Sequence, residues 1–401
     1  FIPGQEMKVI VPEAVKTNSK EGLHMAKLEG FDRIIGMDLS KRTFKACLLT
    51  REKNFEDRKI FSGSMTNEGR KHILSQLGKT DVVAIEGGTS SNNFARELEK
   101  VAGKVFLLNP GKLHIIFQSQ RKTDAADCAK IAKFIRDTHE DNICDMEIPT
   151  EAESELREVV NSYNFAKKQR TQLINKLHSI FNMNGYPEVR ASHLKDNESR
   201  INIIAELLKG VAFNDALLVE GMITSVEFAI EDYLEMMRGF VLANPEVSLP
   251  WLSLPGVGMI TCASIMAYIG DCSRFYSAKQ LRNYVGLVPI IDQSGDHNWQ
   301  GGTTSFGCMP VRRNIMQCAW SMDHRKSDSC QLKVEWDRIV LRGKRKSSAA
   351  IHVANKLLTI GWTLQKKHEL YNGFGDYSNL KAKLRREKLE GIDTSKFPDL
   401  A

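Results

Sequence analysis

The sequence lacks several features that mark whole classes of protein. Its eight cysteines include no Cys-x-x-Cys pair, which argues against a zinc ribbon or finger, and several lie in apolar stretches where a reduced thiol packs as a small hydrophobic group. Gly 28 and Pro 11 are ordinary counts and no repeat period stands out, which argues against collagen-like and repeat-array proteins. No apolar run approaches the ~20 residues of a membrane helix, and residues 1–4 begin neither a basic nor an apolar segment. We therefore expect a cytoplasmic protein without a membrane partner.

What is present is a globular composition with an unevenly placed positive charge. The 401 residues are 42% hydrophobic and 26% charged, which is enough for a sizeable core. The net charge is +7, and residues 305–346 alone hold ten Lys or Arg against four acidic residues. This concentration favours contact with nucleic-acid phosphates, and the alternative is a solvated basic face.

The pattern of apolar residues changes along the chain. Residues 31–148 alternate short apolar runs, typical of strands, with helical spacing at 92–102 and 124–136, which predicts an α/β layer with some parallel pairing. Residues 156–181 and 214–242 have the spacing of long amphipathic helices. These helices predict either an antiparallel pair within the chain or an oligomerising coiled coil. The segments that follow from this pattern are an extension at 1–30, the α/β domain at 31–148, a helical region at 149–247, a mostly helical domain at 248–371 and a charged, mobile tail at 372–401.

Two glycine-rich segments stand out in the second half. Leu254–Gly258 precedes an apolar stretch and predicts a tight turn that opens a helix. Such a turn, with Gly256 and Gly258, can present backbone N–H groups to a DNA phosphate, or it can be a plain helix start. Residues 286–307 predict a long loop or a loop-rich hairpin, and loops of that length in a compact domain are often functional.

Four acidic residues occupy positions where carboxylates carry chemistry. Asp38 and Glu86 each end an apolar strand run, and Asp124 and Asp127 open a predicted helix three residues apart. Carboxylates at the carboxyl ends of strands gather along one edge of an α/β sheet, and the i, i+3 spacing places the other two on one helical face. Oxygen ligands without His or Cys select Mg²⁺ or Mn²⁺. Two such ions would hold the attacking and leaving oxygens of a phosphodiester, although each acid alone would be read as a cap or a surface residue.

The order of these motifs resembles a known family over roughly residues 33–370. The group is the DEDD transposases of bacterial insertion sequences (Piv/MooV), which includes the pilin-gene invertase and the bridge-RNA-guided recombinases. The residues that carry the resemblance are Arg33-Ile34-Ile35-Gly36-Met37-Asp38-Leu39-Ser40-Lys41, Glu86, Asn109-Pro110 and Lys122–Asp127, then Leu254–Gly258, Phe275, Gly286–Pro289, Gln293-Ser294-Gly295, Gly302, Gly307 and Arg312.

The resemblance implies a fold, a chemistry and partners. It implies a RuvC-like domain of the RNase H fold whose tetrad is Asp38, Glu86, Asp124 and Asp127, holding two Mg²⁺ ions or Mn²⁺ in their place. A coiled-coil insertion and a transposase domain follow, and by motif match Ser294 is the nucleophile that forms a covalent phosphoserine link to DNA. The implied partners are element-end and target DNA, a structured noncoding guide RNA and further copies of the chain, as a dimer or dimer of dimers at the nucleoid of a bacterium or archaeon.

Other candidate residues come from this resemblance, from the glycine turn and from the basic segment. Thr303, Thr304 and Ser305 are the fallback nucleophiles, and Gly307-Cys308 departs from the Gly-Asn that the family often has before its basic helix. The expected nucleic-acid contacts are Lys122, Gly256, Gly258, Arg312, Arg313, Lys344, Arg345 and Lys346.

Three rival functions share part of this pattern. A RuvC-type junction nuclease would use the tetrad without the serine, and a non-catalytic RNA-binding scaffold would explain the charge but leave the acids without a role. An actin-like ATPase needs a glycine close behind Asp38, where this chain has Leu39–Arg42.

Overall fold

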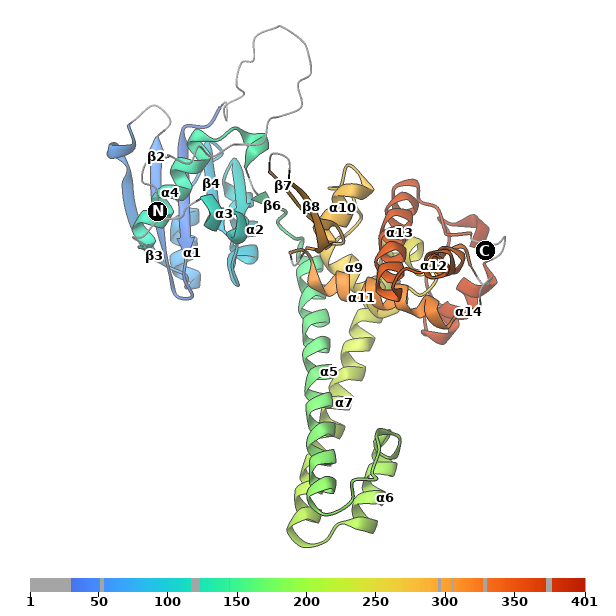
Figure 1. Cartoon of the computed structure of the whole chain (residues 1–401). Helices are drawn as coiled ribbons and strands as arrows, with labels where there is room; N and C mark the ends of the chain where they lie inside the picture. Colours follow the sequence, from blue (N-terminus) through green and yellow to red (C-terminus); the bar gives the residue numbers. More distant parts are fainter. Residues whose placement is uncertain are drawn as a thin grey trace. The chain divides into compact units, whose positions relative to one another are not determined.

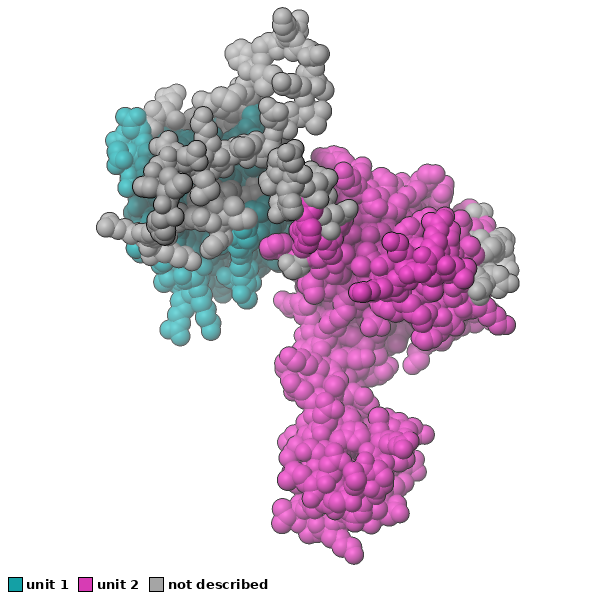
Figure 2. All heavy atoms as spheres, in the orientation of Figure 1, with its two compact units in different colours: residues 1–149 teal, residues 150–401 magenta. Residues whose placement is uncertain are grey.

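The computed structural model describes residues 30–50, 54–116, 123–143, 145–294, 297–304, 306–326, 330–372 and 377–400. Lys122, Gly295, Ser305 and the extension before residue 30 lie outside these ranges. The chain divides into two compact units between Pro149 and Thr150 (Figure 2). The first is an α/β unit and the second is mainly helical.

The first unit is built on a six-stranded sheet in the order β3-β2-β1-β4-β5-β6. Strands β1, β2 and β3 are antiparallel neighbours, β4 and β5 run parallel to β1, and β6 is antiparallel to β5. This arrangement fits the RNase H-like fold expected from the sequence. The elements are β1 (Arg33–Leu39), β2 (Thr43–Thr50), η1 (Phe55–Asp57), β3 (Lys59–Ser64), α1 (Asn67–Leu74), β4 (Asp81–Glu86), α2 (Ser91–Val101), β5 (Lys104–Leu108), α3 (Pro110–Ile116), α4 (Asp124–Asp137), η2 (Glu140–Asn142) and β6 (Asp145–Met146).

Helices cover both faces of this sheet, so the central strands are apolar on both sides. One face, with Ile34 and Val82, packs against α4 through residues such as Ile131. The other face, with Met37 and Val83, packs against α1 and α2. Figure 1 shows α4 on the opposite side of the strands from α1 and α2. Alternation along each strand therefore tells which residues face α4.

The second unit begins with a long helical hairpin and continues as a helical bundle that carries one β-hairpin (Figure 1). Its elements are α5 (Glu151–Met183), η3 (Ala191–Leu194), α6 (Asn197–Leu207), α7 (Gly210–Ala243), α8 (Pro245–Ser253), α9 (Met259–Tyr268), α10 (Ala278–Val285), β7 (Pro289–Ser294), β8 (His297–Thr303), α11 (Met309–Trp320), η4 (Ser321–His324), α12 (Gln331–Leu341), α13 (Lys346–Lys367), α14 (Ser378–Arg386) and η5 (Pro398–Leu400).

The two long helices α5 and α7 form an antiparallel pair. Leu156 near the start of α5 shares one core with Val241 near the end of α7. Phe181 near the end of α5 shares another with Val219 near the start of α7. The antiparallel alternative of the sequence analysis is thus confirmed, while several apolar side chains of α7, such as Phe228 at 70% exposure, face away from this pair.

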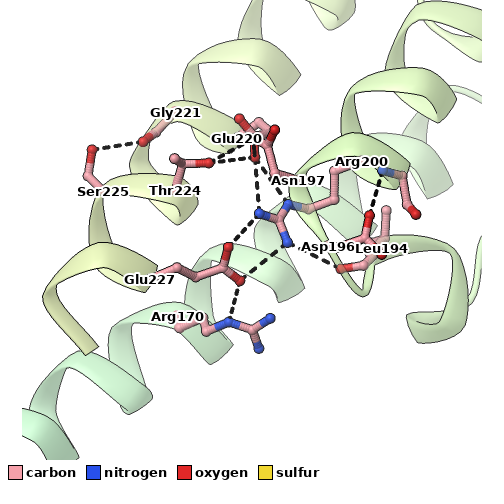
Figure 3. Close-up of polar contacts among 11 residues, drawn as sticks. Arg170, Leu194, Asp196, Asn197, Arg200, Glu220, Gly221, Thr224, Ser225 and Glu227 are labelled. Carbon is pink, nitrogen blue, oxygen red and sulfur yellow. Dashed lines mark hydrogen bonds and ion pairs between the residues drawn. The ribbon is translucent and has the colours of Figure 1, made fainter. Parts of the chain in front are cut away.

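A buried ionic cluster ties α6 to the far end of the pair (Figure 3). The fully buried Arg200 guanidinium donates to the carboxylates of Glu220 and, at 2.7 Å, Glu227 of α7, and Arg170 of α5 also donates to Glu227 at 2.7 Å. Burial by itself would raise the pKa of Glu227, but the hydrogen bonds from Arg200 and Arg170 lower it. Three helices are therefore joined through one charge network with every member paired.

The C-terminal segment is packed, which corrects the expectation of a mobile tail beyond residue 372. Leu384 and Leu389 are buried in the main core of the second unit, together with Ile392 and Phe397. The charged residues between them dominate the composition, but the apolar side chains recur often enough to anchor the segment. In the part of the chain that the structure describes, no helix is long and apolar enough to cross a membrane, and the seven cysteines there are all free thiols.

Candidate active site and nucleic-acid interface

Asp38 and Glu86 lie side by side at the carboxyl ends of adjacent parallel strands. Met37 of β1 pairs with Ile85 of β4, and Asp38 and Glu86 are the next residues on the two strands. Side chains alternate along a strand, so both carboxylates belong to the face that α4 covers. The predicted convergence at one sheet edge holds for these two acids.

A glycine in β1 sets how closely α4 approaches the sheet. A Cβ at Gly36 would lie 2.4 Å from the backbone N of Ala132 and 2.5 Å from the carbonyl O of Cys128. Glycine within a strand often marks such a close approach of another backbone. The helix backbone thus packs directly on β1, two residues before Asp38.

The field of Asp38 reaches α4. Burial is the main cause that raises the pKa of the Cys128 thiol, to about 11, and the charges of Cys47 and Asp38 add to the increase. Cys128 follows Asp127 directly in α4. The negative charge at the end of β1 therefore acts on α4, the helix that carries Asp124 and Asp127.

Asp124 and Asp127 occupy the first turn of α4. Thr123 caps the helix by accepting a hydrogen bond from the Ala126 N–H, and Asp127 accepts one from Lys130 at 3.1 Å. Carboxylates in the first turn are stabilised by the helix dipole. This local stabilisation explains their position without a metal, but it also holds two more carboxylates on the helix that covers Asp38 and Glu86.

The four acids offer a donor set of carboxylate oxygens only, which suits Mg²⁺ or Mn²⁺. The structure brings Asp38 and Glu86 together and puts Asp124 and Asp127 on the facing helix. Within the described residues, however, no three His, Cys, Asp or Glu side chains converge closely enough to form a ligand set. The residues fit the chemistry of a divalent site, and closing it requires their side chains to approach further.

Ser294 ends strand β7 at the tip of the β-hairpin. It pairs with His297 of β8, across two residues that lie outside the described ranges. Thr303 pairs with Pro289 at the opposite, open end of the hairpin. Ser294 is therefore at the tip of the hairpin and the fallback Thr303 is at its base, and the assignment of the nucleophile stays a prediction.

Arg312 has partners that differ from the predicted phosphate contact. Its guanidinium donates to the carbonyls of Val285 at 3.0 Å, Gly286 at 2.8 Å and Thr304 at 2.8 Å, and also to that of Phe306. Four of the five N–H groups of an arginine are then used inside the protein. Arg312 was selected by its charge and by the motif match, and neither signal distinguishes a surface contact from a structural one.

The glycine turn at Leu254–Gly258 opens α9 as predicted, but a carboxylate occupies its helix end. Glu387, just after α14, accepts a hydrogen bond from the Met259 N–H. Lys383 of α14 donates to the carbonyl of Leu254 at 2.8 Å. A phosphate contact at Gly256 and Gly258 would therefore have to displace Glu387, a partner that the sequence reasoning missed because it comes from the segment expected to be mobile.

Two of the predicted basic contacts lie in the connection between α12 and α13, and two more lie in α11 and at the start of α13. Lys344 and Arg345 are exposed in this connection, and Lys346 pairs with Asp323 at 2.8 Å while its side chain stays 57% exposed. Arg313, also exposed, donates to Asn164 of α5 at 2.6 Å. The connection adds the exposed Arg342, which was counted in the basic segment but not selected as a contact.

Comparison with known proteins places both halves of the chain in one kind of protein. The DEDD transposase model of IS110 elements matches residues 35–183, which hold the four acids. The model of the transposase IS116/IS110/IS902 family matches residues 251–334, which hold Ser294 and Arg312. Together the two matches cover more than half of the chain.

Individual relatives agree with the family models. The chain is 22% identical over 342 residues to the transposase for insertion sequence element IS1111A of Coxiella burnetii, covering 84% of this chain and 91% of that protein. It is 22% identical to the transposase for element IS1328 of Yersinia enterocolitica, covering 84% and 98%. It is 30% identical over 121 residues to the pilin gene-inverting protein of Moraxella lacunata, covering 30% and 37%. The chain belongs to the IS110/IS116 family of DEDD transposases.

Proposed function

We propose that this transposase cuts and rejoins DNA with Ser294 as nucleophile and with Asp38, Glu86, Asp124 and Asp127 as the metal-holding tetrad. Transposases of the IS110 family are DNA-cutting and rejoining enzymes. The observation that carries the proposal is the pair Asp38 and Glu86 on the sheet face covered by α4, whose first turn bears the other two acids.

The proposed chemistry is an exchange of one phosphodiester for another. The Ser294 oxygen attacks the scissile phosphorus and forms a serine–phosphate ester. The bond from phosphorus to one deoxyribose oxygen breaks, and that oxygen leaves as a hydroxyl that takes up the proton. Because one ester replaces another, rejoining is the same reaction with a new hydroxyl as attacker and needs no nucleotide cofactor.

The tetrad would hold two Mg²⁺ ions, with Mn²⁺ able to replace them. Bound there, the metal supplies stabilisation of charge on the phosphoryl oxygens and favours the ionised hydroxyl. Asp38 and Glu86 would hold it from the sheet, and Asp124 and Asp127 from the helix. A serine hydroxyl is a poor nucleophile at neutral pH, which is why the proposal pairs it with these acids.

The proposal includes a structured noncoding guide RNA. Its support is the exposed connection of Arg342, Lys344 and Arg345 between α12 and α13, which offers positive charge for phosphates. Sequence choice would then come from base pairing between RNA and DNA. Arg313 and Lys346 would add contacts on the neighbouring helices.

The experiment uses the full chain with co-purified RNA, Mg²⁺ and labelled element-end DNA. We expect Asp124→Ala and Ser294→Ala each to abolish strand exchange while DNA and RNA binding persist. A mixture of the two variants then tests whether the tetrad of one copy can serve the serine of another, because activity returns only if it can. Recombination by Ser294→Ala at the parent rate would exclude the serine mechanism, and cleavage by the parent without any adduct would favour a RuvC-type junction nuclease.

A further inference from the structure

We infer that Arg312 is a positioning residue that clasps the base of the hairpin β7–β8 and thereby fixes the backbone that carries Ser294. The inference rests on the proposed role of Ser294 for its catalytic meaning. The clasp itself rests on independent contacts. It assigns Arg312 a task inside the protein in place of a contact with nucleic acid.

The four acceptors of Arg312 lie on both sides of the hairpin in the sequence. Val285 and Gly286 end α10 just before the hairpin begins, and Thr304 and Phe306 follow just after it ends. One planar guanidinium therefore bonds the chain that enters the hairpin and the chain that leaves it. The Thr304 N–H adds a bond to the Val288 carbonyl at 3.0 Å across the same base.

Two glycines allow this crossing. Gly286 has φ +79° and caps α10, and a Cβ there would lie 1.7 Å from an Arg312 nitrogen and 2.0 Å from the Phe306 carbonyl oxygen. Gly307 has φ +124°, and its Cβ would lie 2.7 Å from the Gly286 N. Both backbone conformations favour glycine, and the space at both positions is taken up by the clasp. Arg312, Gly286 and Gly307 therefore form one packed cluster at the base of the hairpin.

The acceptors are neutral carbonyls, and burial lowers the pKa of Arg312. An arginine that binds phosphate keeps its N–H donors free for it, whereas Arg312 donates four of them to protein carbonyls. Lysine cannot replace the clasp, because its three donors radiate from one nitrogen whereas the guanidinium donors lie in a fixed plane. Without the clasp, the segment that enters the hairpin and the segment that leaves it could move apart. The strand that ends in Ser294 would move with them.

The test compares Arg312→Lys with Arg313→Gln in the full chain. For Arg312→Lys we expect faster amide exchange over residues 289–303, with exchange in α9 and α13 unchanged. Adduct formation with element-end DNA should fall about 100-fold, since a misplacement of about 1 Å has such an effect on a reacting group. The slope of DNA affinity against salt should not change in Arg312→Gln, which removes the charge. Arg313→Gln should reduce the slope of DNA affinity against salt by about 1 and leave amide exchange in the hairpin as in the parent.

The outcomes separate the clasp from the assignment of the nucleophile. Amide exchange is measured without DNA, so an unchanged hairpin in Arg312→Lys would overturn the clasp whatever residue attacks the phosphate. A reduced salt slope in the charge-removing variant Arg312→Gln would instead make Arg312 a phosphate contact and overturn the clasp as well. If exchange in α9 and α13 also becomes faster in Arg312→Lys, the decisive measurement is hairpin exchange in Arg312→Ala with and without added methylguanidinium. Slower hairpin exchange on addition supports the clasp, and no slowing contradicts it.

Discussion

Replacing Gly36 by alanine tests whether the contact between β1 and α4 sets the geometry of the acids. The new Cβ would lie 2.4 Å from the Ala132 N and 2.5 Å from the Cys128 carbonyl oxygen, both backbone atoms of α4. No rotation of a side chain can relieve these contacts. The helix must therefore move away from the sheet by about 1 Å, because ordinary contacts of this kind begin near 3.4 Å.

The displacement has two measurable consequences. Overpacking of this kind costs about 1–3 kcal/mol of the free energy of unfolding. Because Asp124 and Asp127 move with α4 while Asp38 stays on β1, we expect DNA cleavage to fall about 100-fold, the effect of a misplacement of about 1 Å. Urea unfolding and a cleavage assay with labelled element-end DNA measure the two effects on the same preparation.

Gly78→Ala is the matched control in the same unit. A Cβ at Gly78 meets nothing within 4 Å. Gly78→Ala should therefore change the free energy of unfolding by less than about 1 kcal/mol and cleave DNA at the parent rate. The contrary result is a Gly36→Ala protein that loses stability as expected and still cleaves DNA at the parent rate. In that case the spacing between β1 and α4 would not control the acids.

Three further predictions concern the second unit. Burial is the main cause that lowers the pKa of Lys383 to about 8, from the ordinary lysine value of 10.5. Above pH 8 the folded chain loses the Lys383 proton while the unfolded chain keeps it, so the free energy of unfolding rises with pH. Between pH 7 and pH 9 this rise should be about 1 kcal/mol larger in the parent than in Lys383→Met, as measured by urea titrations. Arg200→Ala should lower the free energy of unfolding by about 3 kcal/mol and speed amide exchange in α6, because it removes the buried partner of Glu220 and Glu227. Amide exchange in α6 as in the parent would contradict the role of the cluster. Leu384→Ala should cost about 2–5 kcal/mol in the same titrations, whereas a mobile C-terminal segment would lose nothing.

The sequence predicts the parts of the fold that have strong local periodicity. The helix expected at 92–102 is α2 at Ser91–Val101, and that expected at 124–136 is α4 at Asp124–Asp137. The loop-rich hairpin expected within 286–307 is β7–β8. The edge strand β3 escaped prediction because Lys59–Ser64 holds only two large apolar residues, and its pairing with β2 is a tertiary effect.

The candidate site is predicted in part for the same reason. The ends of apolar runs identify Asp38 and Glu86. The parallel pairing of β1 with β4 that joins them was not predicted, because the helix expected at 92–102 connects β4 to β5 and not β1 to β4. Charge alone could not tell Arg312 from an exposed basic residue, because its acceptors are carbonyls in two segments on either side of the hairpin. Glu387 and Lys383 were missed because contacts more than a hundred residues apart in sequence leave no local pattern.

The most direct test of the proposed mechanism is denaturing electrophoresis of the full chain after incubation with labelled element-end DNA, Mg²⁺ and co-purified RNA. The mechanism predicts a label that migrates with the protein, is absent from Ser294→Ala and Asp124→Ala, and remains in Thr303→Ala. A label of equal strength in Ser294→Ala, or cut DNA from the parent with no protein-linked label, would contradict it.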